Sequence, residues 1–147
     1  MVKLCFCIRR LPHLSHDEFL SYWSQTHPRV AGPGAARALG MRRYVQLRAL
    51  PEALNRRVAS GRPGLEPPFD GIAEVWLDSV EAWERAWASA EGSAVMKRLM
   101  EDEQNFIDWS RSTIFLAEEH VLIDESGSGP GPGPGPGPGP GPGEGEG

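Results

Sequence analysis

Cysteine is scarce in this sequence, which has only Cys5 and Cys7 among its 147 residues. At positions i and i+2 of a strand, two side chains share one face with Cα atoms roughly 6.5 Å apart, which is at the edge of disulfide reach. Few other soft ligands lie nearby in the sequence for a metal site. We therefore expect two reduced side chains packed in a sheet.

Long apolar runs and an excess of positive charge are also missing. No stretch approaches the roughly 18 apolar residues that a membrane-spanning helix needs, and Arg9 and Arg10 follow the first apolar residues too closely for a signal peptide. The 15 Lys and Arg residues are outnumbered by 20 Asp and Glu residues, whereas a nucleic-acid-binding protein needs a basic face. The sequence predicts a cytoplasmic protein that binds neither membranes nor nucleic acid.

Glycine and proline are concentrated at the end of the chain. Residues 126–147 hold 11 of the 18 Gly, 7 of the 14 Pro and no apolar side chain. Their alternation has a period of two, which excludes collagen because its triple helix needs Gly at every third position. Pro removes backbone donors, Gly raises the entropic cost of ordering, and no apolar burial offsets that cost. We expect one domain over 1–125 and a disordered tail over 126–147.

Hydrophobic periodicity predicts the elements of the domain, because strands alternate every second residue and amphipathic helices repeat every three to four. The predicted strands span 2–9, 41–50, 70–78 and 113–123. The predicted helices begin at His16, with a break or kink at Pro28, and at Val80, with an interruption at 91–93 before the helix runs on to about Asp108. This βαββαβ order is typical of a ferredoxin-like α+β sandwich, with helices on one face of an antiparallel sheet.

The second face of such a sheet also needs a cover, since a large apolar patch is rarely left in water. The side chains expected on this face mix apolar and acidic types: Tyr44, Trp76, Ile114, Leu116, Glu74 and Glu118. The mixture is typical of a lined cavity, and the simplest cover is a second copy of the sheet. We therefore expect a homodimer with one cleft per subunit.

His27 is the first candidate for chemistry, because it follows Trp23 by one turn on the apolar stripe of the first helix. An imidazole titrates near neutral pH, which suits proton transfer. The alternative is a core histidine that binds a carbonyl group freed by the break at Pro28.

Acidic residues at apolar positions are the second group of candidates. A buried carboxylate is costly unless it is paired or its pKa rises. Glu74 shares a strand face with Trp76, and an ion pair with one of the neighbouring arginines is the alternative to a catalytic role. On the last long helix, Glu103 falls near the centre of the apolar face and Asp102 at its edge. Together with Glu118 on the last strand, these acids and a histidine make a usable acid–base set.

Several common motifs are absent. The chain has no GxGxxG loop, no GKS or GKT phosphate loop, no HxxxH or CxxC pair and no nucleophilic serine elbow. RNA-recognition modules share the predicted topology, but their aromatic third-strand motif is missing and Glu74 would repel phosphates there. We expect no metal, no cofactor and no nucleic-acid partner.

Three segments of the sequence resemble the EthD family. They are LSHDEFLSYWSQTHPRV (14–30), FDGIAEVWLDSVEAW (69–83) and DEQNFIDWSRSTIFLAEEHVLI (102–123). The resemblance implies a dimeric α+β barrel and small enzymes that usually lack a bound cofactor and occur with oxidative degradation of ethers and aromatics. Fungal relatives act on polycyclic aromatic polyketides, and the family is commonly labelled as oxidoreductase. Its functional histidine falls on His27 and its acidic helix position on Asp102, while 51–68 and the tail lie outside the pattern.

These observations predict a cofactor-free enzyme acting on a small aromatic or apolar molecule. His27 would be the acid or base, Asp102 or Glu118 would orient it, and Glu74 would carry a second proton. The predicted apolar walls are Trp23, Tyr44, Trp76 and Phe106. The reaction could be decarboxylation, isomerisation, cyclisation or oxidation of an electron-rich ring. The alternatives are a non-catalytic protein that binds a hydrophobic metabolite or supports a partner oxygenase, and a dimeric scaffold.

Overall fold

The computed structural model describes residues 1–127, so the tail expected to be disordered lies outside the described residues from 128 onward. One sheet of four antiparallel strands forms the centre, in the order β2-β3-β1-β4. The strands are β1 (Val2–Ile8), β2 (Met41–Arg48), β3 (Gly71–Leu77) and β4 (Thr113–Glu118). The predicted ferredoxin-like α+β fold is confirmed.

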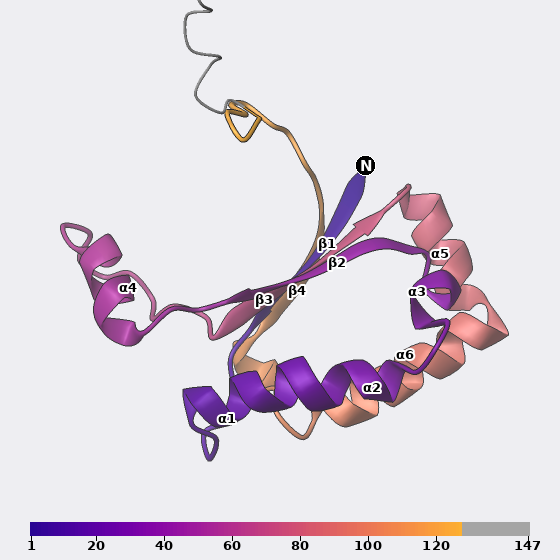
Figure 1. The fold of residues 1–147 in the computed structure, drawn as a ribbon, viewed down its shortest axis with the longest axis horizontal. Helices are drawn as coiled ribbons and strands as arrows, with labels where there is room; N and C mark the ends of the chain where they lie inside the picture. Colours follow the sequence, from indigo (N-terminus) through magenta and orange to yellow (C-terminus); the bar gives the residue numbers. More distant parts are fainter. Residues whose placement is uncertain (128–147) are drawn as a thin grey trace, which may run out of the picture.

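The helices lie on one face of this sheet, as Figure 1 shows, while α4 projects beyond its end. They are α1 (His16–Ser21), a π-helical turn (Tyr22–Thr26), α2 (His27–Ala31), α3 (Ala35–Ala38), α4 (Glu52–Ala59), α5 (Val80–Ala88), α6 (Ala90–Glu103) and a 3₁₀ turn (Trp109–Arg111). None of the helices in residues 1–127 is long and apolar enough to cross a membrane.

The core between the sheet and the helices is divided into two buried clusters. The first contains Ile8, Phe19, Trp23, Ala73, Phe106 and Ile107. The second contains Ala35, Ala38, Leu39, Val95 and Leu99. Trp23 packs directly on β3 because Gly71 has no side chain, and a Cβ atom there would come within 2.4 Å of the indole ring.

Several element boundaries differ from the prediction, through strand pairing in one case and local capping in another. β4 stops at Glu118 rather than at 123, because its neighbour β1 begins at Val2 and Val2 pairs with Glu118. The second helical segment is interrupted at Ser89 rather than at 91–93, since the Ser89 hydroxyl caps α6 by accepting from the Gly92 amide. α6 itself ends at Glu103, five residues before the predicted end at Asp108.

The prediction that Tyr44, Ile114, Leu116 and Glu118 share the open sheet face with Trp76 and Glu74 is wrong. The three β4 residues pair with Phe6, Leu4 and Val2 of β1, which pair in turn with the helix-side residues of β3. In the pairing of β2 with β3, Tyr44 lies opposite Val75 and Arg43 lies opposite Trp76. Tyr44 therefore points toward the helices together with Val75, whereas Trp76 lies on the open face. The register, which shifts between Met41 and Arg43, decides this assignment, and alternation within a single strand does not show the register.

Pro28 does not break the first helix but widens it into a π-helical turn. Proline lacks a backbone N–H and its ring clashes with the carbonyl four residues earlier. The His27 amide donates to the Tyr22 carbonyl, five residues back, instead of to that of Trp23. The Trp23 carbonyl then accepts from Gln46 Nε2 at 3.0 Å. This turn ties the helix to β2 and places His27 against α6, and such turns are frequent at functional sites.

Candidate functional site

His27 and Asp102 form a hydrogen-bonded pair between α2 and α6. His27 Nδ1 lies 2.7 Å from Asp102 Oδ2, and the two side chains are 13% and 9% exposed. Because an ionised carboxylate only accepts hydrogen bonds, Nδ1 carries the proton. In the neutral form of this tautomer the other ring nitrogen, Nε2, has its lone pair available. His27 lines a cavity between the sheet and the helices.

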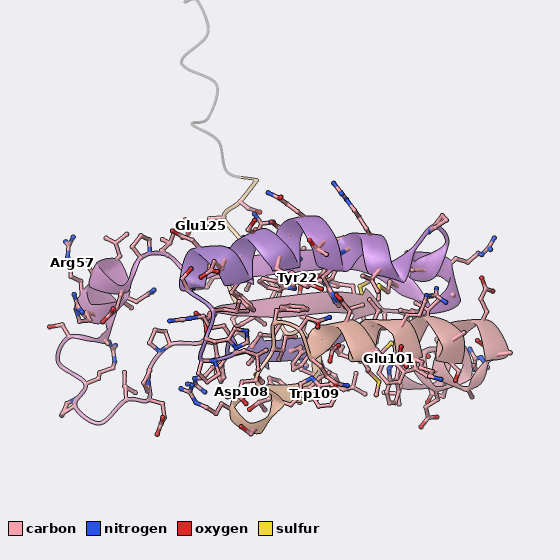
Figure 2. The ribbon with its side chains drawn as sticks, turned by 90° about the horizontal axis from the view of Figure 1, so that it is seen from below. Tyr22, Arg57, Glu101, Asp108, Trp109 and Glu125 are labelled. Atoms are coloured by element: carbon pink, nitrogen blue, oxygen red, sulfur yellow. The ribbon has the colours of Figure 1, made fainter. Side chains whose placement is uncertain are left out.

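Asp102 is held ionised by three donors. The Tyr22 hydroxyl donates to Oδ1 at 2.5 Å, Asn105 Nδ2 donates to Oδ1 at 3.2 Å and His27 donates to Oδ2. Burial would raise the pKa of Asp102, but these hydrogen bonds outweigh it and the pKa is lowered. Figure 2 shows Tyr22 between the two helices that supply the network. Asp102 therefore fixes both the orientation and the tautomer of His27.

Phe106 packs behind this pair rather than in front of it. Its ring is fully buried and its centroid lies 4.9 Å from that of His27 and 5.0 Å from that of Tyr22. It is not among the residues that line the cavity. Phe106 thus holds the imidazole in place, and its predicted contact with substrate is not a feature of the structure.

The cavity that His27 faces has a volume of about 210 Å³ and an almost wholly apolar lining. It lies where the two core clusters separate, since its wall includes members of both, such as Trp23 and Leu39. Trp23 and Tyr44, two of the four predicted wall residues, line it. Besides the tryptophan indoles, the polar side chains in its wall are His27, Tyr44 and Glu103.

Glu103 is the second acid of the site. The sequence places it on the apolar helix face, but the second proton carrier predicted from the sequence is Glu74. It lines the cavity from the last residue of α6, and its Oε2 accepts from Trp109 Nε1 at 3.0 Å. Burial raises its pKa to about 7. The sequence feature that indicated its burial was its position near the centre of the apolar helix face. Glu103 is thus poised to hold a proton near neutral pH.

Glu74 and Trp76 lie on the opposite face of the sheet from His27. Glu74 pairs with Lys3 at 3.4 Å, and Lys3 also pairs with Glu119 at 2.7 Å. The Trp76 ring is stacked by Lys3 at 4.1 Å and by Arg43 at 4.7 Å. The structure therefore does not bring these two residues into the His27 site, because successive strand residues point to opposite faces.

Glu118 also lies away from the cavity. It is the last residue of β4, its side chain is 77% exposed, and it lies 3.3 Å from His120. Of the predicted acids, the structure brings Asp102 alone to His27, because helix α6 faces α2 while the end of β4 does not.

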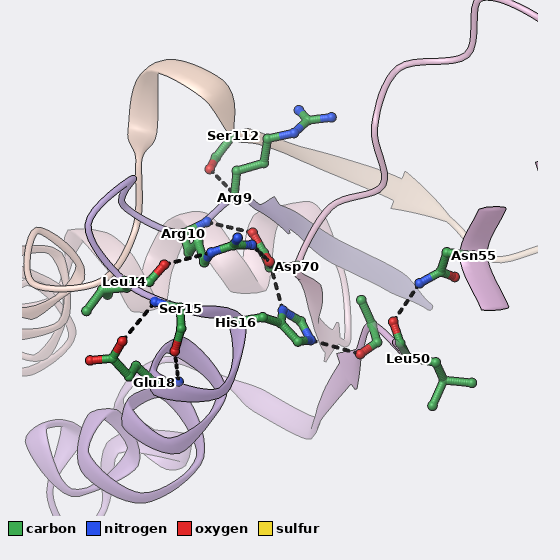
Figure 3. Close-up of polar contacts among 11 residues, drawn as sticks. Arg9, Arg10, Leu14, Ser15, His16, Glu18, Leu50, Asn55, Asp70 and Ser112 are labelled. Carbon is green, nitrogen blue, oxygen red and sulfur yellow. Dashed lines mark hydrogen bonds and ion pairs between the residues drawn. The ribbon is translucent and has the colours of Figure 1, made fainter. Parts of the chain in front are cut away.

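A second, larger cleft of about 510 Å³ lies at the other end of the sheet, where Asp70 organises the polar groups. Asp70 accepts from Arg10 and from His16 Nδ1 at 2.8 Å, while His16 Nε2 lies 3.0 Å from the Ala49 carbonyl (Figure 3). Burial would raise the pKa of Asp70, but the bonds from Arg10 and His16 lower it. Arg10 and His16 together satisfy the Asp70 carboxylate, which indicates a structural cluster.

Metal ligation has little support in the described part of the chain. No group of three His, Cys, Asp or Glu side chains gathers there in a way that could hold an ion. Cys5 and Cys7 are both free thiols in β1, as expected.

The fold and the paired His27 and Asp102 define a small ferredoxin-like protein with a histidine–aspartate pair beside a cavity under one sheet face. A family model described as EthD domain matches residues 11–110, so the chain belongs to the EthD family. No curated protein matches the chain.

Solved structures agree with the fold. An EthD-family protein from Bacillus halodurans is 22% identical, with a TM-score of 0.51 over 82% of this chain and 99% of that one. An EthD-like protein from Ralstonia eutropha is 17% identical, with a TM-score of 0.53 over 84% of this chain and 96% of that one.

Proposed function

We propose that this protein is an enzyme without a bound cofactor that moves protons on a small aromatic or apolar molecule. The observation that carries the proposal is the His27–Asp102 pair, because its imidazole lines an apolar cavity and is backed by the Phe106 ring. His27 Nε2 would take or give the proton, and Asp102 would hold the imidazole and stabilise its charged form. Free Cys5 and Cys7 suit a cytoplasmic location.

Glu103 replaces Glu74 as the second proton carrier in this proposal. A carboxyl group with a raised pKa can donate a proton at neutral pH while His27 accepts one. Such paired transfers accomplish decarboxylation, isomerisation and cyclisation. Oxidation of an electron-rich ring, the nominal activity of an oxidoreductase, is a fourth reaction class, and analysis of the product decides among them.

The pH dependence of kcat/KM tests the role of Glu103. We expect the wild-type value to fall as the pH rises through about 7, because Glu103 then loses its proton. Glu103→Gln should lower the maximum at least tenfold, on the order of one acid–base contribution, and remove this basic limb. Glu101→Gln is the matched control, since Glu101 is an exposed residue of the same helix (Figure 2). If kcat/KM of Glu103→Gln still falls with rising pH as in the wild type, Glu103 is not the proton donor.

The substrate class can be found by mass spectrometry of small molecules that copurify with the protein, followed by turnover assays. The competing proposal is a non-catalytic protein that binds a hydrophobic metabolite, and the almost wholly apolar cavity wall favours it. In that case the copurified molecule would be recovered unchanged and no pH-dependent turnover would be found.

We also propose that a second copy of the chain covers the open face of the sheet. This face carries apolar side chains that the described residues leave uncovered, among them Leu47 and Phe115, which are 44% and 48% exposed. Burying such a patch between two sheets would remove it from water.

Phe115→Asp is expected to convert this dimer into a monomer, because a carboxylate would be buried without a partner at the interface. Sedimentation velocity measures the change. Leu122→Asp serves as a control, since Leu122 lies beyond the sheet and is 92% exposed. A wild-type protein that sediments as a monomer would refute the dimer.

A further inference from the structure

Trp83 of α5 carries a hydrogen-bond donor without a partner. Its Nε1 is buried from solvent, and it is the one buried side-chain nitrogen or oxygen in residues 1–127 that makes no hydrogen bond. Buried donors are nearly always paired, because an unpaired one loses its hydration without compensation. The Trp83 side chain lines the same cavity as His27. An acceptor atom from a bound ligand would therefore supply the partner that this N–H lacks.

Among the described residues, no acceptor lies within hydrogen-bond distance of this donor. Trp87, whose ring centroid lies 5.0 Å away, offers only another indole donor, and most of the cavity wall is apolar. A water molecule needs two to four polar partners to be held in a cavity. An oxygen atom attached to an apolar ring needs only one, because the ring itself fills the apolar space.

We infer that the Trp83 N–H binds an oxygen acceptor of the ligand, and we assign the ligand class as aromatic carbonyl compounds of one or two rings. A carbonyl oxygen accepts a hydrogen bond without bringing a donor of its own into the mostly apolar cavity. This inference rests on the proposed function of the His27 site and specifies its substrate. The cavity of about 210 Å³ is smaller than the roughly 300 Å³ at which pockets for drug-sized molecules begin. The carbonyl oxygen would accept from Trp83, while the reacting part of the ring system faces His27 and Glu103 on α2 and α6.

Binding of 1-tetralone and tetralin tests this inference, because the two bicyclic compounds differ only by the carbonyl oxygen. Calorimetric titration of the wild-type chain should show tighter binding of 1-tetralone. Trp83→Phe keeps an aromatic ring but removes the donor, and it should raise the Kd of 1-tetralone about fivefold, the effect of one hydrogen bond. The Kd of tetralin should stay the same.

Trp87→Phe is the matched control, since Trp87 lines the same cavity from the same helix. It should leave the preference for 1-tetralone intact, and thermal unfolding of both variants checks that they fold. The inference is overturned if wild type binds the two compounds equally or binds neither, or if Trp83→Phe weakens both to the same extent.

Turnover of His27→Gln separates the two proposals. If the variant loses activity while the carbonyl preference does not depend on Trp83, the proposed function stands and this inference fails. If Trp83 determines the preference but His27→Gln turns over normally, carbonyl recognition stands and the catalytic proposal fails.

Discussion

Replacing His27 by glutamine is expected to lower kcat/KM at least 100-fold, which is the contribution of a well-placed acid–base group. Glutamine is similar in size and can still donate to Asp102, but its amide neither accepts nor releases a proton near neutral pH. The free energy of unfolding should change by less than about 1 kcal/mol, because one hydrogen bond replaces another. Steady-state kinetics and urea unfolding measure the two quantities.

His16→Gln is the matched control for this variant. His16 is also a histidine of the first helical segment that is bound to a partly buried aspartate, with 2.8 Å between His16 Nδ1 and Asp70. It lies in the other cleft, so its replacement should leave kcat/KM within about twofold while it lowers the free energy of unfolding by about 1 kcal/mol. Equal losses of activity in both variants would show that His27 acts through stability and not through chemistry.

Asp102→Asn is expected to reduce kcat nearly as much as the loss of His27, by about 100-fold or more, through the tautomer of the imidazole. The asparagine oxygen can still accept from Tyr22 and Asn105. Its amide nitrogen would then face His27 Nδ1, which must accept instead of donate. The ring proton moves to Nε2, so the nitrogen facing the cavity can no longer act as a base.

Asn105→Ala provides the comparison for Asp102→Asn. It removes one donor from Asp102 Oδ1 but leaves the 2.7 Å bond between Asp102 and His27. Its activity should remain within about tenfold of wild type, since the tautomer is preserved. ¹⁵N NMR of the imidazole reports the tautomer directly. A His27 that keeps its proton on Nδ1 in Asp102→Asn would refute this explanation.

The apolar stripe of each helix was enough to predict which helical residues of the candidate site point inward. The apolar stripe of the first helix predicted that His27 faces the core next to Trp23. The apolar face of the last helix predicted that Asp102 and Glu103 point inward. Both predictions depend only on helical spacing, because 3.6 residues per turn assign each side chain to a face without knowledge of the rest of the chain.

The positions of the strand residues in the predicted site depend on how neighbouring strands pair, and the sequence of one strand does not show that pairing. Glu74 and Trp76 share the face opposite the helices, as expected, but His27 and its cavity lie on the other face. Tyr44 lies on the helix side because of its register with Val75. A shift of one residue exchanges the two faces of a strand, and register is determined by pairing between distant segments.

The order of the strands and main helices and the inward direction of His27, Asp102 and Glu103 follow from the sequence alone, since periodicity and turn residues act over a few neighbouring positions. Tertiary packing alone decides that His27 meets Asp102 across 75 positions of sequence. It also decides that the cavity opens between two core clusters on the helix side of the sheet. The volume left between packed side chains depends on every neighbour at once, and no local pattern encodes it.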